Sequence, residues 1–274
     1  MKPAAHRNTQ RGVALITAML VVVLATVAAV AMTSRQMIDV RRSGNVLGHD
    51  QAMQVALGAE GLALRLLAQD RDSRDDIIPW EGCRTPPVPL DLEGMQLSVV
   101  LEDLHCRFNV NNLSGDDAET AQAQLVRLIE EVGAESEVRL DAETLAQALR
   151  DWFDPETDDA YYRAQMPSYL EANARLRSLS ELRLVRGFDA ETYAVLAPWL
   201  AALPAAPTQI NARLAPEPVL AAVDMQAGAD GPPSDYFRLD VLVWLDEQRR
   251  FRLCSTLDVE NRRVVLREQR ACEG

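Results

Sequence analysis

Basic residues are scarce in this chain: 28 Lys and Arg stand against 41 Asp and Glu, which leaves a formal net charge of −13 over 274 residues. A protein that binds nucleic acid over a broad surface needs a cationic face to neutralise phosphates, so this balance argues against that class. The composition, 48% hydrophobic, excludes collagen-like, low-complexity and wholly disordered chains. The length allows one or two domains with a real core.

The chain also lacks the short motifs of common catalytic sites, because it holds no GxSxG, HExxH or P-loop. Its three histidines are His6, His49 and His105, and we expect the last at the surface. Paired carboxylates such as Asp154 and Asp158 could serve hydrolysis, but no histidine lies near them in the sequence to act as a general base. We therefore expect a protein that is not an enzyme.

One long stretch without any charge, VALITAMLVVVLATVAAVAM, covers residues 13–32. Twenty helical residues just span about 30 Å of hydrocarbon. Lys2, Arg7 and Arg11 precede the stretch without an acidic residue, which is the asymmetry of a cytoplasmic flank. A plain signal anchor explains these features. A cleaved secretory signal fits less well, because the run is too long and no small-x-small cleavage site follows it.

The junction between the basic leader and the apolar run reads QRGVAL (residues 10–15), with glycine at the start of the run. It resembles the class III signal of type IV pilins and type II secretion pseudopilins. In that family a prepilin peptidase cuts after the glycine on the cytoplasmic side, and the apolar segment stays as the stem of the mature subunit. The resemblance implies cleavage between Gly12 and Val13, with methylation of Val13 as the new amino terminus.

The fifth residue after this cut is Thr17. Most members of the family carry Glu there, and its carboxylate meets the amino terminus of the neighbouring subunit. An unpaired carboxylate inside a bilayer is costly, so a subunit with no neighbour above it gains by losing that acid. The departure resembles the K-type minor pseudopilin, the large subunit at the pseudopilus tip.

Residues 33–70 continue in a helical pattern after the apolar run, with apolar residues at helical spacing. The segment ALGAEGLALRLL (residues 56–67) is similar to the stem helix of pilin-like folds. A coiled-coil linker is the alternative, but no heptad repeat persists long enough to favour it.

Beyond the stem, extended and helical patterns occur in blocks. Residues 71–95 are rich in Asp and Pro and are expected to form a loop. Alternating or apolar runs predict strands, and helical periodicity with acidic first turns predicts helices. The expected strands are 96–102, 106–112, 235–245, 250–257 and 262–267. The expected helices are 117–132, 141–153 and 189–203. A capping box at Ser178–Glu181 precedes a further short helical run, which Gly187 ends.

We therefore expect an α+β fold, in which a long N-terminal transmembrane stem helix packs on a small antiparallel, pilin-like sheet. A large, mostly helical insertion separates the first strand from the later ones. The expected divisions are a leader (1–12), the transmembrane stem (13–32), the periplasmic stem (33–70), a pilin-like α+β domain (71–107 and 225–274) and a helical insertion domain (108–224).

This order resembles the K-type pseudopilin over nearly the whole chain. The likeness is clearest in DWFD (residues 151–154), in residues 173–187 and in QINA (residues 209–212). In the family the last motif continues as Asn-Thr-Ala, whereas this chain has RLA at residues 213–215.

All four cysteines follow the apolar segment, in the part expected to be exported. An even number of cysteines in an oxidising compartment favours disulfides. Of the three pairings of four cysteines, we expect the two local ones, Cys83–Cys106 and Cys254–Cys272. A metal site is the weaker interpretation, because the chain has no CxxC and its histidines are not at ligand spacing.

Five carboxylates fall within the nine residues DWFDPETDD (151–159), and no basic residue follows until Arg163. Such a run is tolerated on a solvated loop or around a hard cation that takes six to eight oxygen ligands. The residues alone leave both open and slightly favour the loop. The resemblance favours the cation, since K-type members bind calcium in this region. The matching ligands are Asp151, Asp154, Asp158, Asp159 and Asn173, with Glu156 as an additional candidate, and the implied calcium is structural.

The resemblance implies a minor pseudopilin that caps the tip of the periplasmic pseudopilus of a type II secretion system. Its partners would be the I- and J-type minor pseudopilins, the pseudopilus shaft and the prepilin peptidase, with exoproteins and the outer-membrane secretin as further contacts. The stem would sit in the inner membrane and the head in the periplasm. The alternative is a membrane-anchored periplasmic protein that binds calcium or another ligand, which would need neither Gly12 nor the loss of the acid at Thr17.

Overall fold

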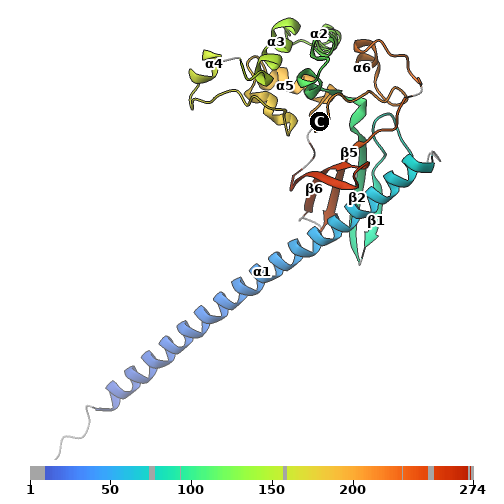
Figure 1. The fold of residues 1–274 in the computed structure, drawn as a ribbon. Coiled ribbons are helices and arrows are strands. Elements are labelled where there is room, and N and C mark those ends of the chain that lie inside the picture. The colour runs from blue at the N-terminus through green and yellow to red at the C-terminus, as the bar shows by residue number, and fades with distance from the viewer. Residues whose placement is uncertain are drawn as a thin grey trace, which may run out of the picture. The chain divides into compact units, whose positions relative to one another are not determined.

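The computed structural model describes residues 10–73, 78–92, 94–156, 159–229, 231–245, 250–270 and 272, and the side chains of these residues except 10–12, 72, 73 and 92. The chain divides into two compact units, Met1–Ala52 and Met53–Gly274, and each is described by itself. Helix α1 (Gln10–Ser73) supplies most of the first unit and the first residues of the second (Figure 1).

The second unit contains a five-stranded antiparallel sheet in the order β1-β2-β5-β6-β7. Its strands are β1 (Val88–Leu92), β2 (Met95–Asp103), β5 (Tyr236–Trp244), β6 (Arg250–Asp258) and β7 (Arg263–Glu268). Strands β2 and β5 are far apart in the sequence but are neighbours in the sheet, and Glu102 of β2 lies opposite Arg238 of β5 (Figure 1). This arrangement confirms the small antiparallel sheet and the long insertion between its strands.

One face of the sheet is apolar and carries the C-terminal part of α1. Alternate residues of the central strands are buried, as expected for a half-covered sheet. On α1 the small residues Ala56, Ala59 and Ala63 are buried at helical spacing. Glu60, in the same stretch of the helix, accepts hydrogen bonds from Ser255 of β6 and Arg267 of β7. The predicted packing of the stem helix on the sheet is therefore confirmed.

Between β2 and β5 the chain is mostly helical and has its own core. It contains α2 (Ala118–Ala134), α3 (Ala142–Phe153), α4 (Ala160–Arg163), α5 (Ala190–Leu196) and α6 (Glu217–Ala222), short 3₁₀ helices at 104–106, 110–114, 179–184 and 197–199, and a parallel pair, β3 (Phe108–Asn109) and β4 (Leu200–Ala201). Side chains such as Leu125, Ile129 and Trp152 form a core shared by these helices. This part of the second unit is called the helical half below.

Two extended segments differ from the prediction. The loop expected at 71–95 contains strand β1, which tolerates Pro89 because an edge strand leaves the outward-facing N–H unpaired in any case. The strand expected at 106–112 is reduced to Phe108–Asn109, because Asn109 accepts from the N–H of Asn111 and turns the chain into a 3₁₀ helix.

The predicted helix starts and stops are mostly confirmed, but helix α5 ends earlier than expected. The capping box predicted at Ser178 and Glu181 is present and begins a 3₁₀ helix. Gly187 adopts a φ of 90°, and a Cβ there would lie 2.8 Å from Leu145. Helix α5 ends at Leu196 rather than at residue 203, because Pro198 cannot donate to the helical ladder.

Asp258 organises the turn between β6 and β7. Its carboxylate accepts hydrogen bonds from the backbone and side chain of Asn261 and from Nε of Arg263 at 2.9–3.1 Å. Burial acts to raise the pKa of Asp258, but these donors outweigh it and hold the pKa below its usual range.

A carboxyl group with a depressed folded-state pKa contributes stability above its unfolded pKa and loses it as the pH falls through the folded value. We expect Asp258→Asn to lower the free energy of unfolding by about 1–2 kcal/mol at pH 7. The difference should shrink below about pH 4 and vanish once Asp258 of the wild type is protonated. Urea unfolding between pH 2.5 and 7 measures it, and a difference that does not change with pH would contradict this assignment.

Candidate functional site

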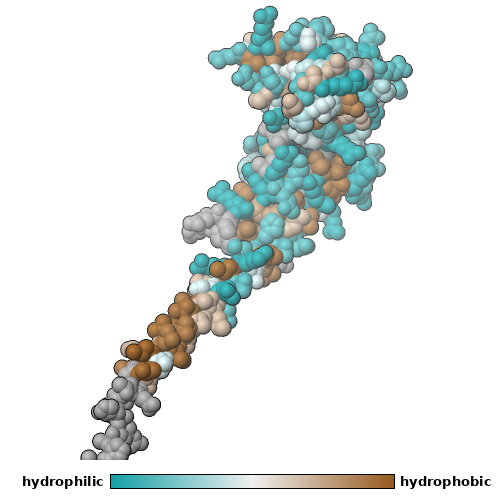
Figure 2. Space-filling view, turned by 90° about the vertical axis from the view of Figure 1, so that its left-hand side faces the viewer, coloured by the Kyte–Doolittle hydropathy of each residue, from teal (hydrophilic) through white to brown (hydrophobic). Residues whose placement is uncertain are grey.

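The first candidate site is the apolar segment of α1 in the first unit. The helix from Val13 to Arg71 is long and apolar enough to cross a membrane, by its length and composition. Its large apolar side chains between Val13 and Met32 are more than half exposed, and Figure 2 shows them as a brown and beige surface. Apolar surface of this extent is stable only against lipid or other apolar helices. The cut expected after Gly12 stays a prediction, and residues 1–9 of the leader lie outside the described residues.

The polar side chains of this segment are satisfied within the helix. Thr17 Oγ1 lies 3.1 Å from the carbonyl oxygen of Val13 and 3.0 Å from that of Ala14, and its hydroxyl donates to them. Thr26 and Thr33 donate in the same way to carbonyl oxygens four residues earlier. Because residues 13–33 also carry no charge, nothing in them needs a polar partner from outside the helix. A Glu at position 17 would need one.

The second candidate site is the acidic segment after α3. Asp151 accepts a hydrogen bond from Gln147 Nε2 at 2.7 Å, and Asp154 accepts one from the N–H of Glu156 at 2.9 Å. Glu156 is exposed. Asp151 and Asp154 therefore each accept a hydrogen bond from a residue close by in the chain.

Asp159 has two structural tasks. One carboxylate oxygen accepts from the N–H of Tyr161 and begins α4, and the other pairs with Arg186 Nη1 at 2.5 Å. The N–H of Asp159 donates to Glu171 Oε1 at 2.7 Å. Glu171, a buried acid that the sequence pattern did not single out, therefore links the segment after α4 to the residue at which α4 begins.

Asn173 lies beside the end of α3, as the resemblance implies. Its N–H donates to the carbonyl oxygen of Trp152 at 3.2 Å, and its φ of 49° is a left-handed conformation that asparagine tolerates. The predicted ligands are all oxygen donors, which is the chemistry that calcium prefers. However, the described residues contain no group of three or more His, Cys, Asp or Glu that could hold a metal, and Asp158 lies outside them. The calcium site therefore stays a prediction.

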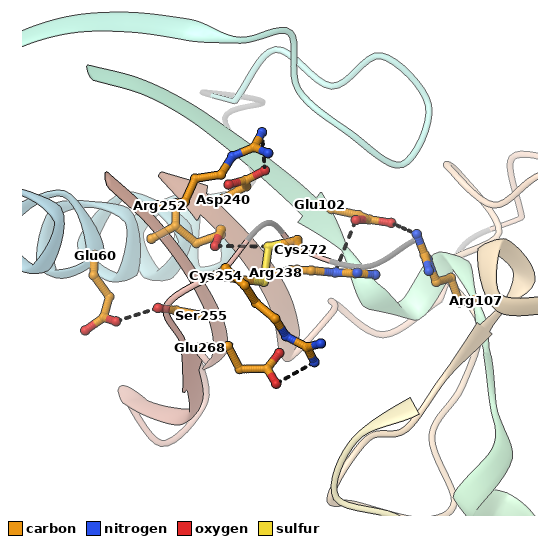
Figure 3. Close-up of a disulfide and its surroundings, with 12 residues drawn as sticks. Glu60, Glu102, Arg107, Arg238, Asp240, Arg252, Cys254, Ser255, Glu268 and Cys272 are labelled. Carbon is orange, nitrogen blue, oxygen red and sulfur yellow. Dashed lines mark hydrogen bonds and ion pairs between the residues drawn. A yellow bond between two sulfur atoms is a disulfide. The ribbon is translucent and has the colours of Figure 1, made fainter. Parts of the chain in front are cut away.

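The disulfide predicted between Cys254 and Cys272 is present, and it ties β6 to the segment after β7 (Figure 3). The bond closes a loop with a sequence separation of 18 residues. In the chain-entropy estimate such a loop stabilises the fold by about 3 kcal/mol.

The disulfide predicted between Cys83 and Cys106 is wrong for this structure, where both are free thiols. The thiol of Cys83 lies 3.3 Å from the carbonyl oxygen of Leu214 and donates to it. A hydrogen bond with Cys83 and burial raise the pKa of the Cys106 thiol. The two sulfur atoms are therefore neighbours that are not bonded to each other.

The QINA motif anchors the helical half to the sheet. Asn211 Nδ2 donates to Asp103 Oδ2 at 2.7 Å, and the hydroxyl of Ser234 donates to the same oxygen at 2.6 Å. Burial raises the pKa of Asp103, against the effect of these two hydrogen bonds. The network joins the end of β2, the QINA segment and the residues before β5.

His105 is buried rather than at the surface as expected. Its Nδ1 lies 2.8 Å from the carbonyl oxygen of Gln209, and the N–H of Asp235 donates to its Nε2 at 3.3 Å. Both ring nitrogens are therefore used to hold backbone, in the same junction as Asn211.

Three asparagines of the run NVNN were not predicted to have a structural role. Asn111 Nδ2 donates to the carbonyl oxygens of Leu176 and Leu203 at 2.9 and 2.8 Å, and its Oδ1 accepts from the N–H of Leu176. Asn109 and Asn112 bind other segments in the same manner. The feature that could have predicted this role is the cluster of side-chain amides directly after a strand, because each amide can both donate and accept a hydrogen bond.

This chain is similar in sequence to a known protein family. Residues 106–205 match the family model described as "Type II secretion system (T2SS), protein K". Curated relatives named type II secretion system protein K include those of Klebsiella pneumoniae (36% identical, 75% of this chain and 66% of the relative), Aeromonas hydrophila (33%, 74% and 66%) and Pseudomonas aeruginosa (34%, 79% and 69%). The chain thus spans about two thirds of the length of these relatives.

A solved structure has a similar fold. It is the crystal structure of the GspK-GspI-GspJ complex from the type 2 secretion system of enterotoxigenic Escherichia coli, with a TM-score of 0.70 and 23% identity over 84% of this chain and 100% of the matched chain. At this identity the likeness shows the fold. The sequence relatives show the family, and the chain belongs to the type II secretion system protein K family.

Proposed function

We propose that this chain is a minor pseudopilin that caps the tip of the periplasmic pseudopilus of a type II secretion system. A prepilin peptidase removes residues 1–12, the apolar part of α1 stays in the inner membrane, and the head lies in the periplasm. From the tip the protein supports export of folded proteins through the outer-membrane secretin. The observation that carries the proposal is a membrane-length apolar segment, residues 13–33, whose threonine hydroxyls are all bonded within the helix, in a chain of the protein K family.

Two features support a place at the tip rather than in the shaft. Thr17 stands where most of the family has Glu and donates only to carbonyl oxygens of α1, so residues 13–33 offer no carboxylate to a subunit above them. The helical half, inserted between β2 and β5, enlarges the head far beyond a single small sheet. A head of that size is difficult to repeat along a closely packed shaft. A membrane-anchored ligand-binding protein would require neither feature.

The partners of a tip subunit would be the I- and J-type minor pseudopilins, which the similar solved complex contains beside its protein K. We expect the full-length chain, co-expressed in detergent-extractable form with the I- and J-type pseudopilins of its own organism, to purify as a complex with one copy of each. The major shaft pseudopilin, tagged in the same way, is the control and should not replace either partner. Purification of this chain alone under these conditions would contradict the proposal.

We further propose that the acidic segment holds a structural calcium ion. Asp151, Asp154, Glu156, Asp158, Asp159 and Asn173 would supply the oxygens. Support comes from the hard-oxygen character of this set and from the hydrogen bond between Asn173 and Trp152, which brings the two ends of the loop together. A bound cation would offset the mutual repulsion of these carboxylates and fix the loop between α3 and α4.

Calcium at about 100 times its Kd should then raise the unfolding temperature of the full-length protein by about 5–10 °C relative to EGTA. The Asp154→Asn variant should lose most of this rise, whereas Glu217→Gln, which removes an exposed carboxylate at the start of α6, should keep it. Differential scanning fluorimetry with calcium, magnesium and EGTA measures the effect. Equal unfolding temperatures with calcium and with EGTA would rule the ion out.

A further inference from the structure

We propose that a crevice between the sheet and the helical half binds a carboxylate side chain of a second polypeptide. The crevice has a volume of about 80 Å³ and lies on the sheet face opposite to α1. This proposal does not depend on a position at the pseudopilus tip. The lining residues that carry the argument are Arg177, Arg238, Thr256, Leu266, Glu268 and Arg270.

Arg238, on the central strand β5, is the cation at the floor of the crevice. Its side chain is only 13% exposed. Its Nε lies 3.3 Å from Glu102 Oε2, and in the part of the chain that the structure describes this is its one ion pair (Figure 3). Burial lowers the pKa of Arg238 to about 10, which still leaves the guanidinium charged at neutral pH. Among the described residues the two terminal nitrogens form no ion pair, so they can donate to a carboxylate.

The carboxylate of Glu102 is already shared. Arg107, also buried, forms an ion pair with Glu102 and donates from Nη1 to the carbonyl oxygen of Ala197 at 3.1 Å. Two buried guanidiniums thus face one carboxylate. Asp240, the next residue of β5 on this face, pairs with Arg252 at 3.5 Å and also attracts Arg238 (Figure 3). Arg84 lies close enough to act on both Asp240 and Arg238, so the positive charges still outnumber the carboxylates. A buried positive charge without its own counter-ion is unfavourable, and an anion in the crevice would relieve it.

The remaining walls determine the kind of anion. Arg177 is exposed beside the crevice, and the one acid in the described lining, Glu268, already pairs with Arg270 at 2.7 Å. Leucines form most of the rest, at positions 104, 179, 200, 203 and 266. Since a water occupies about 30 Å³ of liquid, the volume is that of two or three waters. It suits a carboxylate on a short apolar stem, and apolar walls favour an acidic residue with apolar neighbours.

Thr256 allows a matched pair of variants. It lies directly opposite Arg238 in the β5–β6 register and lines the crevice. Thr256→Glu would place the chain's own carboxylate beside Arg238, and Thr256→Gln has the same size without the charge. We therefore expect Thr256→Glu to fill the site and Thr256→Gln to leave it open to a carboxylate.

The probes are two labelled synthetic peptides, acetyl-Ala-Leu-Glu-Leu-Ala-amide and its Gln analogue, added to full-length protein in detergent. By fluorescence anisotropy the wild type, Thr256→Gln and the control Arg250→Gln, at an exposed position of β6, should prefer the Glu peptide by tenfold or more. Thr256→Glu and Arg238→Gln should lose that preference. No preference in the wild type, or an undiminished preference in Thr256→Glu, would overturn the proposal. Displacement by acetate at the peptide's own concentration would also overturn it, since the site would then bind a small anion.

Discussion

Replacing Gly12 with Leu is expected to leave the chain in the membrane as an uncut precursor and to reduce protein export to the level of a deletion strain. Glycine has no side chain, so the backbone at Gly12 can approach a peptidase closely, and a Leu side chain would prevent that approach. The uncut leader would keep Lys2, Arg7 and Arg11 at the end of the stem, where they hold it at the cytoplasmic surface. Mass spectrometry of the purified chain detects residues 1–12, and the activity of an exported enzyme in the culture medium measures secretion.

The matched control is Gly44→Leu, which makes the same substitution in the same helix. A Cβ at Gly44 would meet no atom within 4 Å, so the change should be tolerated there. We expect this variant to be cut normally and to support export. Export by Gly12→Leu at the wild-type level would count heavily against a pseudopilin role.

Replacing Arg267 with Ala is expected to lower the free energy of unfolding by about 3 kcal/mol. Glu60 is buried, and its carboxylate accepts from Arg267 Nη2 at 2.7 Å, from Arg267 Nε at 2.9 Å and from Ser255 Oγ at 2.7 Å. Without Arg267 the carboxylate keeps one donor in an apolar contact between α1 and the sheet. We expect the low end of the range for a broken buried pair, because the Arg267 side chain is 49% exposed and water can replace part of it.

Two further variants separate this effect from a general loss of surface charge. Arg270→Ala breaks the more exposed pair with Glu268 and should cost less than about 1 kcal/mol. The double variant Glu60→Gln/Arg267→Ala removes the buried charge as well, so its loss should be smaller than the sum of the two single losses. Urea unfolding of the wild type, Glu60→Gln, Arg267→Ala and the double variant measures this coupling, and additive losses would show that Glu60 does not depend on Arg267.

Local patterns predicted most of the fold. The apolar run of α1, the alternation of β5 and the helical periodicity of α2 and α3 are all repeated over many residues, and each was confirmed. Strand β1 was missed because Pro89 and its acidic neighbours have the composition of a loop. Its extended form comes from pairing with β2, which no local pattern encodes.

The long-range contacts of the head could not be predicted in the same way. Glu60 and Arg267 are 207 residues apart in the sequence, and Asn111 and Leu203 are 92 apart. Such pairs form only once the topology is set, and neither residue type is unusual in its own segment. The family resemblance identified Asn211 as part of a motif, but the buried carboxylate that it binds, Asp103, emerged only from the structure.

The two predicted disulfides also show that local sequence does not determine which side chains meet. Loop length and compartment favoured two local disulfides equally. The bond between Cys254 and Cys272 is present, whereas Cys83 is turned toward the carbonyl oxygen of Leu214. Sequence spacing indicates which cysteines can meet, but the surrounding hydrogen-bond acceptors affect how their sulfur atoms are oriented.

The position of this chain in an assembled pseudopilus tests the central proposal most directly. Met166 is 98% exposed, so an epitope tag inserted beside it should remain accessible to an antibody on the fibre. In electron micrographs of fibres from cells that overproduce the shaft subunit, the proposal predicts gold label at one end of each fibre. Label distributed along the shaft, or absent from fibres that nevertheless form and export normally, would contradict a tip subunit.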